Sequence, residues 1–244
     1  MRTLVYFVAD VHLGMQAYDP AERERRFVSF LKDIPRDALA VYLLGDIWDF
    51  WYEYRDVVPR EGARVVAELI ALVDAGVDVV FVPGNHDIWA YSFFESLGIR
   101  KCEQPLNVRI GDKSFCLGHG DSLGGGRVGY NLILKLFRSR FAQKAFSTLH
   151  PWIAWRLATS WSESSRKKHE GYHFRGTEEP LYRFAAKQQA DYCIFGHFHD
   201  RVDMPLPNGG RLIVLGDWMD GKQPHAVFDT ASSSFSLSLS SPRS

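Results

Sequence analysis

The chain has 244 residues, a length that favours one large domain, or one domain with an insertion, over a repeat array or a mini-protein. Apolar residues make up 46% of the composition and charged residues 24%, which excludes disorder and collagen-like structure as descriptions of the whole chain. Lysine plus arginine and aspartate plus glutamate both number 29, so no overall charge points to nucleic acid as a partner.

The first third of the chain alternates predicted strands and helices. Asp19 followed by Pro20 is typical of a helix start and predicts a helix from there to Lys32. Pro59 similarly predicts a helix that runs to about Ala75. Continuous apolar runs predict strands buried on both faces at residues 4–9, 40–44 and 77–82. This β-α-β-α-β order implies a parallel sheet.

The rest of the core is predicted to contain hairpins. Gly111-Asp112 and the glycines at 209–210 are turn signals between apolar runs. Strands are expected at residues 115–117, 192–195, 212–215 and around 235–239. Two sheets that face each other, with helices outside, would satisfy both halves of the pattern.

A basic segment lies between these runs. Residues 125–175 hold ten basic and two acidic side chains, an excess of +8 that the remainder of the neutral chain balances. Apolar residues recur there at helical spacing, with Trp152, Trp155 and Trp161 further on. We predict a basic, apolar-striped helical insertion. Because its charge accompanies an apolar stripe, an anionic membrane or an amphiphile with a phosphate head is a better partner for it than nucleic acid; the alternative is a solvated basic helix pair whose tryptophans pack on the core.

The three cysteines show no CxxC spacing, and Cys116 and Cys193 lie in apolar runs, so we expect free thiols and a reducing compartment. No stretch approaches 18 uncharged apolar residues, so we expect a protein that at most lies on a membrane surface.

Five predicted strands are each followed at once by polar side chains that bind metals. The carboxyl ends of strands in α/β sheets are where ligand sites form. The residues are Asp10 and His12, Asp46 and Asp49, Asn85 with His86 and Asp87, His119 and Asp121, and His197 and His199.

The spacing of these residues favours one shared site. Asp10 and His12 are two positions apart, as are His197 and His199, so in extended backbone each pair points to one side. Oxygen and imidazole ligands without thiolate suit Mn²⁺, Fe²⁺ or Zn²⁺, and seven candidates are about right for two ions. The seven are Asp10, His12, Asp46, Asn85, His119, His197 and His199. Asp49, Asp87 and Asp121 are either residues that orient the ligands or loop caps.

The ordered set Asp-x-His, Gly-Asp-x-x-Asp, Gly-Asn-His-Asp, Gly-His-Gly-Asp and Gly-His-x-His resembles the calcineurin-like metallophosphoesterases. The resemblance implies a four-layer αββα fold with two divalent metals, most favourably Mn²⁺. One metal would be held by Asp10, His12, Asp46 and His199, and the other by Asp46, Asn85, His119 and His197. His86 would then donate a proton to the leaving oxygen or stabilise the transition state, with Asp87 holding its tautomer.

The position and content of the insertion resemble the UDP-2,3-diacylglucosamine pyrophosphatases of lipid A synthesis. The resemblance implies release of UMP and 2,3-diacylglucosamine 1-phosphate, a helical lid at residues 124–189 and a core at 1–123 and 190–244. It also implies a peripheral protein on the cytoplasmic face of a Gram-negative inner membrane. The substrate contacts it implies are Asn85, His86, His197, Tyr130 and Ser165, and charge alone adds Arg166 and Lys168 as phosphate candidates. The sequence departs from that group at His86, where its best-known members have Arg, and at Arg127, where they have Asp.

Two alternatives stay open. The first is a broader metal-dependent phosphodiesterase for another phospholipid or a nucleotide. The second is a non-catalytic scaffold that docks on membranes through the basic helices; the presence of all seven candidate ligands weighs against it.

Overall fold

The computed structural model describes residues 2–54, 56–125, 136–137, 139–157, 160 and 172–240. Tyr130, Ser165, Arg166 and Lys168, four of the predicted substrate contacts, lie outside the described residues, as does Arg127.

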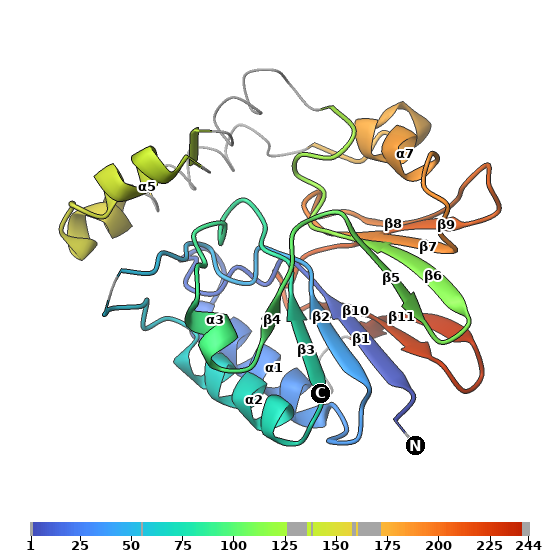
Figure 1. Cartoon of the computed structure of the whole chain (residues 1–244), viewed down its shortest axis with the longest axis horizontal. Coiled ribbons are helices and arrows are strands. Elements are labelled where there is room, and N and C mark those ends of the chain that lie inside the picture. The colour runs from blue at the N-terminus through green and yellow to red at the C-terminus, as the bar shows by residue number, and fades with distance from the viewer. Residues whose placement is uncertain are drawn as a thin grey trace.

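The first sheet has six strands in the order β11-β10-β1-β2-β3-β4 (Figure 1). Strands β1 to β4 pair in parallel, as the β-α-β-α-β pattern predicts, while β10 and β11 are antiparallel additions at one edge. The strands are β1 (Leu4–Val8), β2 (Ala40–Leu43), β3 (Asp78–Phe81), β4 (Arg100–Lys101), β10 (Gln223–Asp229) and β11 (Ser234–Ser240).

The second sheet has five strands in the order β5-β6-β7-β9-β8. The hairpins predicted at Gly111-Asp112 and at residues 208–210 are confirmed as the antiparallel pairs β5–β6 and β8–β9. The strands are β5 (Leu106–Ile110), β6 (Lys113–Leu117), β7 (Tyr192–Phe195), β8 (Arg201–Pro205) and β9 (Arg211–Leu215).

The two sheets pack face to face and helices cover their outer faces (Figure 1). Because side chains alternate along a strand, Phe7 points between the sheets, where it stacks on Phe115, while Val8 packs on the helices. Helices α1 (Pro20–Asp33), α2 (Ala63–Asp74) and α3 (Phe93–Ser96) cover the first sheet, and α7 (Pro180–Ala185) covers the second. The predicted αββα architecture is therefore confirmed.

The predicted start of one helix is wrong. Helix α1 begins after Asp19, whose carboxylate accepts hydrogen bonds from the next turn, as expected. Helix α2, however, begins at Ala63 and not at Pro59. Gly62 adopts a left-handed conformation (φ 77°), and the indole of Trp48 donates to the Glu61 carbonyl. This contact with the core keeps residues 59–62 out of the helix.

The described part of the predicted insertion is partly helical. It contains α5 (Arg140–Phe146), a helical stretch at 151–157, the 3₁₀ turn η1 (Gly176–Glu178) and α7. Helix α7 packs on the second sheet through Leu181 and Ala185. Helix α5 lies apart from both sheets (Figure 1). In the described part of the chain, no helix has the length and apolar character needed to cross a bilayer.

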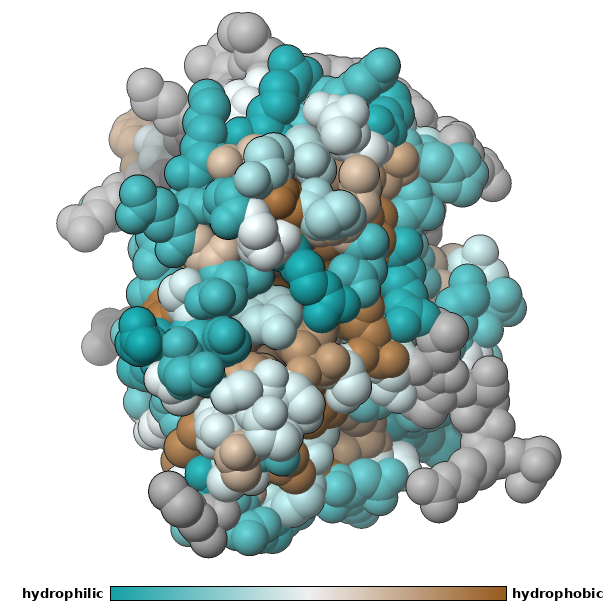
Figure 2. Space-filling model, turned by 90° about the vertical axis from the view of Figure 1, so that its right-hand side faces the viewer, coloured by the Kyte–Doolittle hydropathy of each residue, from teal (hydrophilic) through white to brown (hydrophobic). Residues whose placement is uncertain are grey.

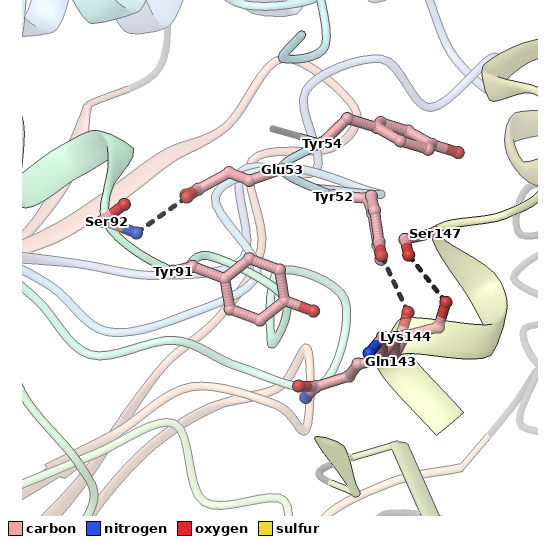
Figure 3. Close-up of a pocket in the computed structure, with 8 residues that line it drawn as sticks. All are labelled: Tyr52, Glu53, Tyr54, Tyr91, Ser92, Gln143, Lys144 and Ser147. Atoms are coloured by element: carbon pink, nitrogen blue, oxygen red, sulfur yellow. Dashed lines mark hydrogen bonds between the residues drawn. The ribbon is translucent and has the colours of Figure 1, made fainter. Parts of the chain in front are cut away.

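Aromatic side chains and two hydrogen bonds attach α5, and Phe137 just before it, to the core. The Trp89 indole donates to the Phe137 carbonyl (2.7 Å), and the Tyr52 hydroxyl donates to the Gln143 carbonyl (3.0 Å; Figure 3). Phe146 packs on both Trp89 and Tyr52. A pocket of about 410 Å³ lies beside this junction, and none of the candidate metal ligands is among its described lining residues.

Candidate metal centre

The loops that follow β1, β2, β3, β6 and β7 meet at one edge of the sandwich, and their backbone is unusual there. Five candidate ligands have left-handed backbone: Asp10 (φ 53°), His12 (51°), Asp46 (51°), His197 (74°) and His199 (56°). The extended backbone assumed from the two-residue spacing is therefore wrong. Asp10 and His12 still converge, since His12 Nε2 lies 3.9 Å from Asp10 Oδ1. Backbone strain of this kind, about 1–3 kcal/mol per residue, persists only where the surrounding structure enforces it.

Glycines allow the close approach of these loops. A Cβ atom on Gly84 would lie 2.2 Å from Asp46 Oδ1, and one on Gly196 would lie 2.3 Å from Asp10 Oδ2. Neither position has room for a larger residue, because only glycine permits so close an approach.

One half of the site joins Asp10, His12, Asp46 and His199. The Nε2 atoms of His12 and His199 are 3.3 Å apart. Asp10 Oδ1 lies 3.8 Å from His199 Nε2, and Asp46 Oδ2 lies 3.9 Å from His12 Nε2. Asp10, His12 and Asp46 are almost completely buried.

The other half joins Asp46, Asn85, His119 and His197. His119 Nε2 lies 3.2 Å from both Asp46 Oδ2 and Asn85 Oδ1. The His197 ring packs edge-on against His119, with 5.1 Å between ring centroids, and its backbone N–H donates to the Asp10 carboxylate. Asp46 thus faces both halves.

The hydrogen bonds of three imidazoles fix which nitrogen faces the site. His12 Nδ1 lies 3.2 Å from Asp49 Oδ1, His199 Nδ1 lies 3.3 Å from Asp217 Oδ2, and His119 Nδ1 lies 3.1 Å from the Leu44 carbonyl. An acceptor next to each Nδ1 keeps a hydrogen on that atom, so Nε2 is the nitrogen that each ring directs into the site. These Nε2 atoms lie close to each other or to carboxylate and amide oxygens, an arrangement that a bound cation stabilises. The donor set therefore fits divalent metal ions.

The electrostatics agree with a site built for positive charge. Burial lowers the pKa of His12 to about 4, which leaves its imidazole neutral and free to act as a ligand near pH 7. Burial also lowers the pKa of His119, but the charge of Asp46 outweighs it and raises that pKa well above its usual value. Burial raises the pKa of Asp10 to about 6, although His119 and His199 oppose the rise.

His86 lies beside the site with one nitrogen directed into it. Its Nδ1 lies 2.8 Å from the Asp49 carbonyl, so that nitrogen donates, and its Nε2 lies 3.8 Å from Asp46 Oδ2. The side chain is 12% exposed, in contrast to the fully buried His119, so an incoming group can reach it.

The predicted contact between Asp87 and His86 is wrong. The buried Asp87 carboxylate instead accepts hydrogen bonds from the backbone N–H groups of the neighbouring loops, at Gly84 (2.7 Å), Ile47 (2.8 Å) and Asp46 (3.2 Å). Asp87 therefore acts as a loop cap, because its carboxylate lies beneath the loops and not beside the imidazole. The backbone carbonyl of Asp49 binds His86 Nδ1, the role that was predicted for the Asp87 carboxylate.

Sequence reasoning missed some residues that support the ligands. Asp217 lies in a Leu-Gly-Asp-Trp stretch that follows a strand. The sequence did not reveal that Asp217 orients His199. Gln104 accepts a hydrogen bond from the Gly120 N–H (2.8 Å), next to His119, and also binds the Asp121 side chain. The position of Asp217 after a strand could have marked it as a candidate from sequence. Gln104 has no such sequence signal.

Comparison with known proteins identifies the family. The calcineurin-like phosphoesterase family model matches residues 3–201. The chain belongs to this family. Its resemblance to the family, noted from five short motifs, is thereby confirmed, as is the prediction of a metal-dependent phosphoester hydrolase.

Similar proteins cover almost the full chain. A UDP-2,3-diacylglucosamine hydrolase of Porphyromonas gingivalis is 34% identical, over 94% of this chain and 95% of that protein. A UDP-2,3-diacylglucosamine hydrolase of Hamiltonella defensa is 30% identical, over 91% of this chain and 92% of its own length. Among solved structures, a dimetal phosphatase of Danio rerio is 14% identical with a TM-score of 0.49, over 93% of this chain and 92% of its own.

Proposed function

We propose that this phosphoesterase hydrolyses the diphosphate of UDP-2,3-diacylglucosamine and releases UMP and 2,3-diacylglucosamine 1-phosphate. The observation that carries the reaction type is the convergence of imidazole nitrogens, carboxylates and one amide on two adjoining positions. The names of relatives that align over nine-tenths of both chains support the choice of substrate.

We assign two divalent ions to the site, with Mn²⁺ as the favoured metal because the ligands are oxygens and imidazole nitrogens. Asp10, His12, Asp46 and His199 would hold one ion. Asp46, Asn85, His119 and His197 would hold the other, so Asp46 would belong to both ligand sets. When bound, such ions neutralise phosphoryl charge and acidify water.

His86 would contact the phosphoryl group. With Nδ1 donating to the Asp49 carbonyl, Nε2 is the nitrogen that faces the site, and in the imidazolium form it would give a proton to the leaving oxygen or donate a hydrogen bond to a non-bridging oxygen. Asn85 and His197 border the same space and would also touch the substrate. Asp87 supports this group indirectly by fixing the loop that carries Asn85 and His86.

Residues 124–189 would form the lid over the lipid part of the substrate, with Tyr130, Ser165, Arg166 and Lys168 as its polar contacts. Five of the eight exposed large hydrophobic residues in the described part of the chain lie between positions 136 and 157, and Phe141 (84%) and Trp152 (60%) are among the most exposed. The Arg156 guanidinium stacks on Trp152. Exposed rings beside basic groups suit an anionic membrane surface.

The face that carries the hairpins of the second sheet is mixed, with apolar patches between hydrophilic side chains (Figure 2). We place the membrane contact on the insertion, where exposed rings stand beside basic groups, with the enzyme peripheral at the cytoplasmic face of the inner membrane.

The deciding experiment supplies purified protein and Mn²⁺ with UDP-2,3-diacylglucosamine in H₂¹⁸O, beside bis(4-nitrophenyl) phosphate. We expect UMP that carries ¹⁸O. Turnover of the generic diester alone would instead indicate a broader phosphodiesterase, and no metal-dependent turnover of either compound would leave the membrane-docking scaffold.

A further inference from the structure

Arg23 is a fully buried arginine on the inner face of α1. It is 1% exposed, whereas Arg25, two residues along the helix, is largely exposed and pairs with Glu22. A guanidinium is costly to bury unless its hydrogen bonds are satisfied, so its partners indicate what it is there to hold.

Those partners are backbone carbonyls of the loop that links β1 to α1. Arg23 Nη1 donates to the His12 carbonyl (2.9 Å), and Nη2 donates to the carbonyls of Met15 (3.0 Å) and Ala17 (2.7 Å). The planar, multidentate guanidinium thus ties several points of one loop to a rigid helix.

The backbone of His12 is strained and is held at both ends by hydrogen bonds. Its backbone is left-handed (φ 51°), a conformation that a histidine abandons unless its neighbours enforce it. Its N–H donates to the Asp46 carbonyl (3.0 Å), so Arg23 on the carbonyl side fixes the other end of the same residue.

We propose that Arg23 is a positioning residue that holds His12 in the strained backbone conformation needed for metal binding, and so sets the affinity of one of the two ions. The inference rests on the metal centre of the proposed function. It concerns a backbone tether and not a group that touches substrate.

The same helix supports the second imidazole of that half. Arg26 donates to the Trp218 carbonyl (2.9 Å), next to Asp217, which holds His199 Nδ1. Trp218 also packs on Phe27 and Phe30 of α1. His119, in the other half, takes its support from the Leu44 carbonyl instead. Loss of Arg23 should therefore affect the two ions unequally.

The test titrates full-length, chelator-treated protein with Mn²⁺ and follows the free ion by its EPR signal. Wild type should bind two ions. In Arg23→Met we expect one dissociation constant to rise about 10- to 100-fold and the other to change less than about threefold, the range typical of residues that support metal ligands. Arg25→Met, on the exposed face of the same helix, should match wild type.

A second pair of variants separates positioning from general damage. His12→Ala should weaken the same ion, and adding Arg23→Met to it should weaken that ion no further, because the tether acts through His12. Arg23→Lys keeps the charge but loses the planar guanidinium with its several donors. Its dissociation constant for the affected ion should lie between those of wild type and Arg23→Met. This variant tests the inference if Arg23→Met fails to fold. Equal weakening of both ions, no weakening in either variant, or an undiminished effect in the His12→Ala background would overturn the inference. If wild type itself binds no metal, the proposed function fails instead.

Discussion

Gly84 offers the most direct perturbation of the candidate centre. Its φ is not in the left-handed region, so alanine is tolerated by the backbone and only the added methyl group matters. That Cβ would lie 2.2 Å from Asp46 Oδ1 and 2.9 Å from His119 Cδ2, whereas ordinary contacts begin near 3.4 Å. The Asp46 carboxylate must therefore move by about 1 Å.

A displacement of this size at a reacting centre costs about 100-fold in rate, or about 2.7 kcal/mol of transition-state stabilisation. Since Asp46 faces both halves of the site, Gly84→Ala should also weaken the binding of both ions. The assay is turnover of bis(4-nitrophenyl) phosphate with Mn²⁺, together with metal content by elemental analysis.

Gly210→Ala is the matched control. Its Cβ would lie 2.3 Å from the Ala190 carbonyl oxygen, an equally severe overlap, but in the turn between β8 and β9. It should lower the melting temperature and leave the activity per bound metal unchanged. The reasoning is refuted if Gly84→Ala keeps both ions and wild-type turnover, or if Gly210→Ala loses metal to the same extent.

Three further predictions concern catalysis, pH and stability. His86→Ala should lower kcat by about 10²- to 10⁴-fold while elemental analysis still finds the wild-type metal content; equal loss of metal would contradict a role in proton transfer. Because burial raises the pKa of Asp10 to about 6, metal binding below that pH must displace a proton, so the Mn²⁺ affinity measured by titration should fall as pH drops from 7 to 5, and an affinity that does not change over that range would contradict this reasoning. Phe7→Ala removes a ring stacked between Tyr42 and Phe115 at the centre of the sandwich, and urea denaturation should show a loss of about 3–5 kcal/mol, whereas a loss below about 1 kcal/mol would mean that the sheets repack.

The sequence predicted the elements whose signals are local. Apolar runs identified the buried strands, Asp19-Pro20 identified the start of α1, and glycine turns identified both hairpins. Strand β10 was missed because it contains Pro224 and alternates in burial, unlike the continuous apolar runs that marked the other strands. The start of α2 was misplaced because a tertiary contact, Trp48 with Glu61, stops the helix at Gly62.

The candidate ligands were also accessible from sequence, since five strands deliver them in order to one edge of the fold. The orientation of each side chain could not be predicted from the sequence. Left-handed backbone at Asp10 and His12, the Asp49 carbonyl behind His86 and the position of Asp87 beneath the loops all depend on which loops lie side by side.

The amino-acid sequence by itself determined the layer architecture and the chemistry available at its edge, because strand periodicity and residue type are properties of short segments. Only the tertiary structure decided which nitrogen of each imidazole faces the site and which residue holds it there. Those choices come from contacts such as Asp217 with His199 and Arg23 with the His12 carbonyl, which join segments whose relation no local pattern encodes.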